Sequence, residues 1–323
     1  MQPLVKICNL NKYFLYKGKT LKAINNVSFD IFPQEIVGLV GESGCGKTTL
    51  ARVLMRLYEP TKGDIFFDGK SILKFTRKKI RALRREMQYI FQDPYSSLNP
   101  RMTAGEIIAE PLHIHRILPP KERIYKVYDL LKLVGLHAEC FKRFPHEFSG
   151  GQRQRIGIAR ALTLNPRFIV CDEPISALDV SMQSQIINLL KDLQKKLGLT
   201  YLFISHALAM VKYLSNRIAV MYLGHLVELA SSSELYHNPL HPYTQGLLLA
   251  IPIPDPTMKE RHAHVLIKGE VPSLIDPPKG CVFCTRCPKA KWICHQTSPI
   301  WQEVSPGHQV ACHLYNTNYK AIF

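Results

Sequence analysis

Long hydrophobic runs are missing from this sequence. No uninterrupted apolar stretch approaches the roughly 20 residues that a transmembrane helix requires. Residues 1–6 lack the apolar core of a secretory signal peptide, so we expect a protein of the cytoplasm. In that reducing compartment the nine cysteines should stay as thiols or bind metal rather than form disulfides.

Acidic residues are scarce relative to basic ones. The chain has 25 Asp and Glu against 42 Lys and Arg, a formal net charge of +17. This balance favours an anionic partner, but nucleic acid, anionic lipid and nucleotide all satisfy it. The densest basic run, residues 74–85, has few aromatic residues among its charges and therefore does not indicate base stacking. A solvated helix face explains such a run more often than a nucleic-acid groove does.

The remaining composition is that of a globular protein. The 323 residues are 46% hydrophobic and 21% charged, which suggests about two domains with a full core. Short apolar runs at 36–40, 168–171 and 201–204 alternate with segments of helical periodicity. Strands alternating with helices predict an α/β fold with a parallel sheet and a site at the carboxyl ends of its strands.

The most specific motif is a glycine-rich loop, Gly41-Glu42-Ser43-Gly44-Cys45-Gly46-Lys47-Thr48, between an apolar strand and a helix. Its glycines let successive N–H groups point at a phosphate chain, and the helix amino terminus adds positive potential. Lys47 is expected to reach the outer phosphates, and the Thr48 hydroxyl is expected to bind Mg²⁺. The predicted ATP-binding residues here are Gly41, Ser43, Gly44, Cys45, Gly46, Lys47, Thr48 and Thr49.

Polar residues follow three of the predicted strands. Asp172 and Glu173 end the run 168–171, where Asp172 could hold Mg²⁺ through water and Glu173 could polarise the attacking water. Gln92 and His206 end two further strands and could reach the same sheet edge. Each of these two, taken alone, is more often a satisfied polar residue than a catalytic one.

The order of these motifs, with FSGGQ at 148–152 and SALD at 176–179, resembles an ATP-binding subunit of ABC transporters over about residues 4–250. The resemblance implies a mixed sheet core, an antiparallel β subdomain and a helical subdomain at about 95–160. It also implies that Ala207 replaces the usual aspartate and removes an expected helix cap.

The resemblance further implies roles for individual residues. Phe14, with Tyr13 as the alternative, would stack on adenine, and Gln92 would sense Mg²⁺ and the membrane subunit. Asp179 would cross a dimer interface, and His206 would contact the γ-phosphate. The residues that would close over ATP held by a partner subunit are Ser149, Gly150, Gly151 and Gln152.

The stretches 91–102 and 241–245 are similar to dipeptide and oligopeptide importer ATPases in particular. That likeness implies a paired related ATPase, two transmembrane permease subunits, a periplasmic or surface solute-binding protein, and a place on the cytoplasmic face of the inner membrane. Nickel and other small-solute importers share the architecture. A nucleic-acid-associated ABC ATPase is the alternative from another class, but such proteins usually carry two cassettes or a large insertion, and no nucleic-acid partner is expected.

Five cysteines cluster near the end of the chain, beyond a proline-rich boundary at 251–256 that separates a domain of residues 1–250 from a C-terminal extension, 251–323. Zinc, an iron–sulfur cluster or free thiols are all compatible with the spacing. The importer likeness implies a [4Fe–4S] cluster on Cys281, Cys287, Cys294 and Cys312, with Cys284 as a rival ligand. The distance in sequence from the glycine loop suggests a structural role in assembly rather than in nucleotide binding. We expect Cys8, Cys140 and Cys171 to pack in the core.

Overall fold

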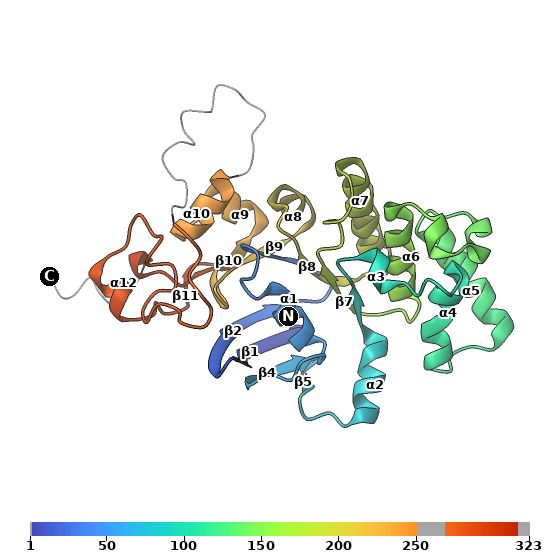
Figure 1. Ribbon diagram of the computed structural model, residues 1–323, viewed down its shortest axis with the longest axis horizontal. Coiled ribbons are helices and arrows are strands. Elements are labelled where there is room, and N and C mark those ends of the chain that lie inside the picture. Colours follow the sequence, from blue (N-terminus) through green and yellow to red (C-terminus); the bar gives the residue numbers. More distant parts are fainter. Residues whose placement is uncertain (1, 251–268, 316–323) are drawn as a thin grey trace, which may run out of the picture. The chain divides into compact units, whose positions relative to one another are not determined.

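The computed structural model describes residues 2–250 and 269–315 (Figure 1). The chain divides into two compact units. The helical unit comprises residues 31–36 and 74–205, and the P-loop unit, named for the loop at 41–48, comprises residues 2–30, 37–73 and those from 206 onward. The proline-rich boundary at 251–256 lies outside the described residues.

The P-loop unit contains a four-stranded sheet of order β2-β1-β4-β5. Antiparallel pairs join β1 to β4 and β4 to β5. Residues 12–14, which include the two candidate aromatic residues, lie within β1. The strands are β1 (Val5–Tyr16), β2 (Lys19–Ile31), β4 (Lys62–Phe67) and β5 (Lys70–Ser71).

A second set of strands in the P-loop unit has the order β11-β12-β10-β9-β3. The pair β3–β9 is parallel, whereas β9–β10, β10–β12 and β11–β12 are antiparallel, so the predicted mixed sheet is confirmed. Every residue of β3 is buried, as expected for a parallel strand covered on both faces. The strands are β3 (Ile36–Val40), β9 (Arg217–Tyr222), β10 (His225–Ser231), β11 (Gln302–Ser305) and β12 (His308–Val310).

The helices of this unit begin at identifiable caps. The Ser231 hydroxyl caps α9, and the His241 ring accepts a hydrogen bond from the Tyr243 amide to cap α10. Ala207 precedes α8, where its methyl group offers no hydrogen-bond acceptor. The helices are α1 (Lys47–Leu54), α8 (Leu208–Leu214), α9 (Ser232–His237), α10 (Pro242–Leu249), α12 (Trp292–Gln296) and the 3-10 turn His313–Tyr315.

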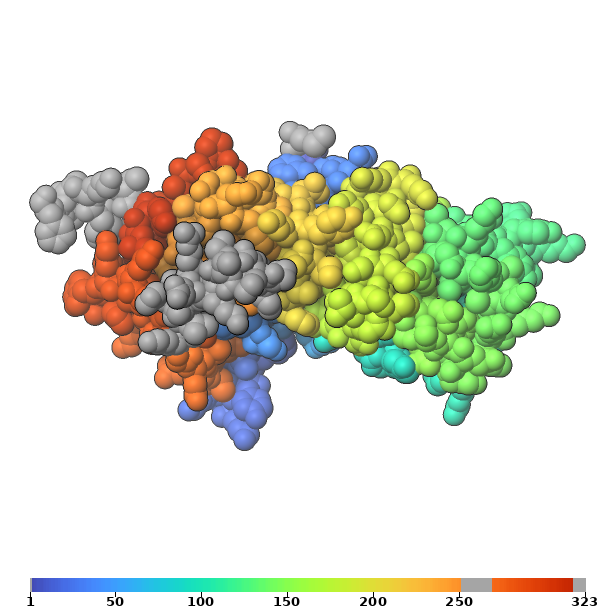
Figure 2. Space-filling view, turned by 90° about the horizontal axis from the view of Figure 1, so that it is seen from above, coloured from blue at the N-terminus to red at the C-terminus, as the bar shows by residue number. Residues whose placement is uncertain are grey.

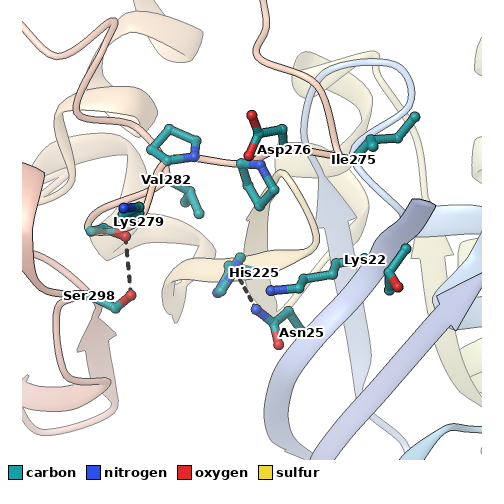
Figure 3. A pocket seen from close by; sticks show the side chains of 12 residues that line it. Lys22, Asn25, His225, Ile275, Asp276, Lys279, Val282 and Ser298 are labelled. Carbon is teal, nitrogen blue, oxygen red and sulfur yellow. Dashed lines mark hydrogen bonds between the residues drawn. The ribbon is translucent and has the colours of Figure 1, made fainter.

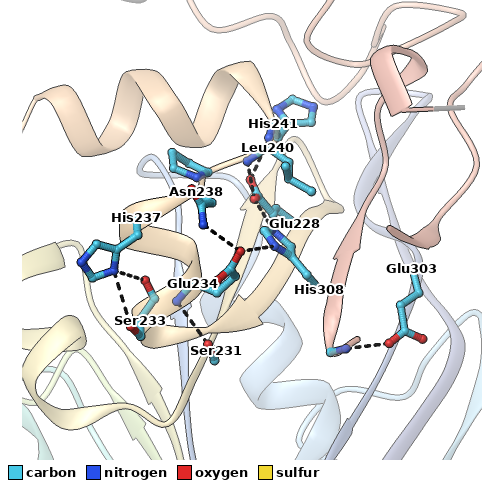
Figure 4. Close-up of polar contacts among 12 residues, drawn as sticks. Glu228, Ser231, Ser233, Glu234, His237, Asn238, Leu240, His241, Glu303 and His308 are labelled. Atoms are coloured by element: carbon cyan, nitrogen blue, oxygen red, sulfur yellow. Dashed lines mark hydrogen bonds and ion pairs between the residues drawn. The ribbon is translucent and has the colours of Figure 1, made fainter. Parts of the chain in front are cut away.

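The C-terminal segment, residues 269–315, joins the sheet through β12, where Val310 lies opposite Glu228 of β10. Glu228 is fully buried and accepts hydrogen bonds from the amides of Leu240 and His241. The ring of His308 contacts the same carboxylate at 2.7 Å (Figure 4). In the space-filling view the orange-to-red surface of this segment adjoins the lighter orange surface of residues 225–250 (Figure 2). One buried carboxylate thus ties three stretches of chain together.

The helical unit is built on three parallel strands of order β8-β7-β6. Their register places Met87 opposite Phe168 and Phe168 opposite Thr200. All residues of β7 and β8 are buried, which accounts for their apolar sequences. The strands are β6 (Met87–Ile90), β7 (Phe168–Asp172) and β8 (Thr200–Ile204).

Helices of the helical unit start with strong capping signals. Ser149, the N-cap of α6, forms a capping box with Gln152, and Asp179 caps α7. Gly198 ends α7 in the left-handed conformation. The helices are α2 (Arg77–Glu86), α3 (Pro94–Ser97), α4 (Ala104–Ile114), α5 (Pro120–Leu133), the 3-10 turns Ala138–Lys142 and Pro145–Glu147, α6 (Gly150–Leu162) and α7 (Val180–Leu197).

Candidate functional site

The glycine loop connects β3 to α1 through a backbone that requires glycine. Gly41, Gly44 and Gly46 have φ values of 151°, 77° and 108°. A Cβ atom would lie 2.1 Å from the carbonyl oxygen of Met221 at Gly41, and 2.2 Å from that of Ala23 at Gly46. Both approaches are far shorter than real contacts. The loop therefore keeps the tight, amide-rich curve that suits a phosphate chain.

Lys47 lies at the start of α1 with its side chain folded into this loop. The ammonium donates to the carbonyl oxygens of Gly41 and Glu42 at 2.7 and 2.9 Å, and the residue is only 5% exposed. Burial raises the pKa of the neighbouring Cys45 thiol, which lies 3.7 Å from the same ammonium. The positive charge is thus held at the centre of the loop, with Thr48 and Thr49 in the first turn behind it.

The two candidate aromatic residues of β1 are differently engaged. The Tyr13 hydroxyl contacts the side-chain oxygens of Asn11 and Asn25 at 3.0 and 2.8 Å. The Phe14 ring makes an edge contact with Tyr58 at 5.6 Å and carries the Lys12 ammonium at 4.8 Å. Phe14 is thus held through its ring, whereas Tyr13 is held through its hydroxyl.

In the helical unit, Asp172 ends β7 and is 3% exposed. The Tyr89 hydroxyl of the neighbouring β6 donates to Asp172 Oδ2 at 2.6 Å. Such a bond to a carboxylate is charge-assisted and fixes the orientation of the acid. A carboxylate at a strand end and the hydroxyl of Thr48 are both hard oxygen donors of the kind that Mg²⁺ takes.

Glu173 follows directly, and its carboxylate accepts a hydrogen bond from the Gln92 amide at 3.0 Å. Its backbone has a φ of 46°, in the left-handed region that non-glycine residues seldom occupy. The Glu173 amide donates to Ile204 of β8 at 2.9 Å, and its carbonyl accepts from the Ser176 hydroxyl at 3.0 Å. These bonds hold the unfavourable conformation in place.

The Ser149–Gln152 stretch forms the first turn of α6. The amide of Gln152 donates to the Ser149 hydroxyl at 3.3 Å, and the Ser149 amide donates to Gln152 Oε1 at 3.1 Å. Helix geometry directs the first-turn N–H groups of Gly150 and Gly151 out of the helix end, where an anion is favoured. Arg153 is held beneath by the Tyr95 ring, 3.8 Å from its guanidinium carbon.

The remaining predicted residues have local structural partners. The Asp179 carboxylate accepts bonds from the Ser181 hydroxyl at 2.7 Å and the Met182 amide at 2.9 Å, which lower its pKa. Asp179 is therefore the cap of α7, whatever else it does. His206 is exposed, and its carbonyl accepts from the Leu208 amide at 3.1 Å.

The C-terminal segment reaches the glycine loop directly. Arg286 makes two bonds to the Glu42 carboxylate, at 2.8 and 3.1 Å. The Glu42 amide donates to the Tyr243 hydroxyl at 2.9 Å. Although 244 residues of sequence separate Arg286 from Glu42, the fold brings the two side chains into contact.

The five C-terminal cysteines are close in space but do not form a recognisable metal site. Burial raises the pKa of Cys281 to about 12, with smaller contributions from the neighbouring Cys294, Cys312 and Cys284. Within residues 2–250 and 269–315, no three His, Cys, Asp or Glu side chains are grouped as ligands of one metal ion. The predicted cluster site on Cys281, Cys287, Cys294 and Cys312 therefore has no support from the geometry. Cys140 and Cys171 are buried as expected, and Cys8 is partly exposed.

A polar cavity of about 420 Å³ lies between β2, the start of β10 and the C-terminal segment (Figure 3). His225 and Asn25 meet there at 3.1 Å. Burial, helped by the charge of Lys22, lowers the pKa of His225 to about 4. The histidine is thus neutral in the folded protein at neutral pH.

The strand, glycine loop, buried lysine and helix define a P-loop nucleotide-binding protein. Residues 24–176 match the ABC transporter family, and residues 227–294 match the family described as oligopeptide/dipeptide transporter, C-terminal region. Among the helices of the described ranges, none is both long enough and apolar enough to span a membrane.

Similar proteins cover almost the whole chain. The putative oligopeptide transport ATP-binding protein YkfD of Bacillus subtilis (strain 168) is 57% identical over 97% of this chain and 96% of its own length. AppF of the same organism, an oligopeptide transport ATP-binding protein, is 51% identical over 98% of each. The ATP-binding cassette MJ0796, solved as a dimer in a post-hydrolysis state bound to ADP and Pi, has a TM-score of 0.65 at 29% identity, covering 71% of this chain and 98% of that one. The chain belongs to the ATP-binding subunits of ABC transporters, in their oligopeptide/dipeptide branch.

Sequence reasoning missed three residues that support the site. Tyr89 gave no signal beyond being a strand aromatic, and Arg286 stood unremarked within the cysteine spacing. Tyr243 lies in the 241–245 stretch that pointed to the importer family, but the sequence did not show that its hydroxyl would meet the glycine loop.

Proposed function

We propose that this chain is the ATP-hydrolysing subunit of an importer that powers uptake of di- and oligopeptides. It works at the cytoplasmic face of the inner membrane, with a paired ATPase, two permease subunits and a solute-binding protein. The observation that carries the proposal is the likeness to oligopeptide transport ATP-binding proteins along nearly the full chain, 57% identity over 97% of it. The buried Lys47 inside a glycine loop supports nucleotide binding independently.

The residues fit an ATP-sandwich mechanism. Phe14 would stack on adenine, and the glycine loop and Lys47 would hold the phosphates. Thr48 and Asp172 would hold Mg²⁺, and Gln92 would sense it. The metal would supply positive charge that neutralises the phosphates. The first turn of α6, Ser149–Gln152, would face the γ-phosphate of the nucleotide on the paired subunit.

Hydrolysis would proceed by in-line attack of water on the γ-phosphorus. Glu173 would accept the proton of that water as its oxygen bonds to phosphorus, and the bridging bond to the β-phosphate would break to release ADP. Lys47 and His206 would stabilise the charge that develops on the phosphoryl oxygens. Gln92, bonded to Glu173, would keep that carboxylate aligned.

Reconstitution tests the proposal. The chain alone should bind ATP but hydrolyse it slowly, and assembly with its paired ATPase and permease subunits should raise turnover. Proteoliposomes of the assembly should then take up a labelled oligopeptide in the presence of ATP and the solute-binding protein. Full turnover by a preparation shown by sedimentation to be monomeric would rule out the sandwich. Uptake of nickel ions but not of peptide would refute the proposed cargo and leave the proposed ATP hydrolysis unaffected.

The cysteines carry a separate proposal, a [4Fe–4S] cluster on Cys281, Cys287, Cys294 and Cys312. It rests on the importer resemblance and on the occurrence of five cysteines within 32 residues of sequence, 281–312. Protein purified without oxygen should be brown and hold about four irons and four sulfides. Serine at any of the four positions should bleach it, whereas Cys284→Ser should keep the colour. Zinc in place of iron would refute the cluster.

A further inference from the structure

Glu42 places a carboxylate inside the nucleotide loop, and its charge is matched by Arg286 of the C-terminal segment. The guanidinium takes both carboxylate oxygens, at 2.8 and 3.1 Å. The Arg286 side chain is 6% exposed and that of Glu42 is 23% exposed. A two-pronged pair sheltered from water is the strong form of a charge-assisted bond.

Aromatic side chains fix Arg286 in this position. Its guanidinium carbon lies 5.8 Å from the centre of the Tyr222 ring, and one of its nitrogens lies 3.3 Å from the Tyr222 hydroxyl. Phe283, three residues earlier in the same turn, packs on Tyr222 at 5.3 Å and on Tyr243 at 5.4 Å. Packing of these aromatic side chains therefore holds Arg286 of the C-terminal segment in place.

Tyr243 binds the main chain of Glu42. Its hydroxyl accepts the Glu42 amide at 2.9 Å, and the tyrosine itself is fully buried. The carbonyl of Glu42 accepts from Lys47 at 2.9 Å. Amide, carbonyl and carboxylate of the second residue in the loop are thus all occupied, two of the three by residues beyond 240.

We propose that Arg286 is a positioning residue for the nucleotide, since it neutralises the Glu42 carboxylate that would otherwise repel the triphosphate. This rests on the proposed function, ATP binding at the glycine loop. Without the guanidinium, an uncompensated negative charge would lie in the loop that receives the phosphates, and like charges at short range in a partly buried site repel strongly. The C-terminal segment then contributes to ATP affinity without touching ATP.

The test compares four full-length proteins: the parent, Arg286→Gln, Glu42→Gln and the double variant. Dissociation constants for Mg-ATP and for AMP are measured by displacement of a fluorescent ATP analogue, after thermal melting has shown that each is folded. Arg286→Gln should weaken ATP about tenfold, equivalent to about 1.4 kcal/mol. AMP should change little, since its single phosphate carries less charge. The double variant should regain most of the lost affinity because it no longer has the unpaired Glu42 carboxylate.

A matched control is Lys289→Gln, which removes another positive charge from the same segment, where the Lys289 ammonium donates to the Gln245 side-chain oxygen at 3.3 Å. Its ATP affinity should equal that of the parent. If Arg286→Gln does not fold, Arg286→Lys keeps the charge without the two-pronged geometry and should give an intermediate loss. Unchanged ATP affinity in a folded Arg286 variant, or a double variant as weak as Arg286→Gln, would overturn the inference. Failure of the parent to bind ATP would instead refute the proposed function.

Discussion

The Tyr89 hydroxyl donates to Asp172 Oδ2 across 2.6 Å, between the neighbouring parallel strands β6 and β7. Asp172 is 3% exposed, so its carboxylate depends on partners from the protein. The Tyr89 hydroxyl thus orients the acid proposed to hold Mg²⁺. The arrangement leads to a direct experiment.

Tyr89→Phe removes one hydroxyl and leaves the ring in place. We expect the free energy of unfolding to fall by about 1.5–3 kcal/mol, the usual worth of a hydrogen bond to a charged group. Urea titration measures it. Tyr125→Phe, at a side chain that is 70% exposed, is the matched control and should change stability by less than about 0.5 kcal/mol. Equal effects of the two substitutions would show that the Tyr89–Asp172 bond contributes nothing to stability.

Glu173→Gln should leave ATP binding intact and reduce turnover of the assembled transporter by at least about 10²-fold, because it removes the carboxylate that polarises water. The amide is nearly the same size and can still bond to Gln92. A phosphate-release assay and equilibrium ATP binding, run side by side, separate the two effects. Glu139→Gln, at a side chain that is 86% exposed, should leave both at the parental level. Near-parental turnover in Glu173→Gln would show that Glu173 does not polarise the attacking water.

Two glycines should respond oppositely to alanine. At Gly46 the new methyl group would meet the Ala23 carbonyl at 2.2 Å and the φ of 108° would be strained, so Gly46→Ala should abolish ATP binding. At Gly157, inside α6, a Cβ meets no atom within 4 Å. Gly157→Ala should raise the free energy of unfolding by about 0.5–1 kcal/mol. Binding by Gly46→Ala at parental affinity would contradict the loop geometry.

Acid should weaken the P-loop unit through two buried histidines. Burial lowers the pKa of both His225 and His241 to about 4. The unfolded chain takes up these protons near pH 6.5, whereas the folded chain does so only near pH 4, so stability falls as pH drops through that window. The full loss for each histidine is on the order of 3 kcal/mol.

His241→Asn isolates one of these contributions. An asparagine oxygen can still cap α10 by accepting the Tyr243 amide, which His241 accepts at 3.0 Å, but it does not titrate. Melting temperatures between pH 7 and 5 should therefore fall less steeply in this variant than in the parent. The same slope in both proteins would show that His241 is not a source of the acid sensitivity.

The local signals of this chain were readable from the sequence, and the distant contacts were not. The apolar runs at 36–40, 168–171 and 201–204 are the buried strands β3, β7 and β8, since a short apolar run is a signal that acts over a few residues. The length of β1 is harder to read from the sequence, because its second half is only partly buried and does not alternate clearly.

The contact between Arg286 and Glu42 illustrates the limit. The sequence around neither residue indicates a partner, and an arginine between cysteines is typical of an ordinary surface charge. Their pairing depends on Phe283 and Tyr222 packing correctly, which is a property of the folded core rather than of either local sequence. Contacts of this kind can be found only once the chain is folded.

The buried Glu228 has a consequence for chimeric proteins. Its carboxylate bonds to the Leu240 and His241 amides and to the ring of His308, which lies 80 residues away. In a chimera that joined two relatives at the proline-rich stretch, Glu228 would come from one parent and the residue at position 308 from the other. Losing one partner of such a buried charge typically costs about 3–5 kcal/mol. A hybrid with a foreign C-terminal segment should therefore be joined before β10, at the Leu223–Gly224 turn, so that carboxylate and histidine come from one parent.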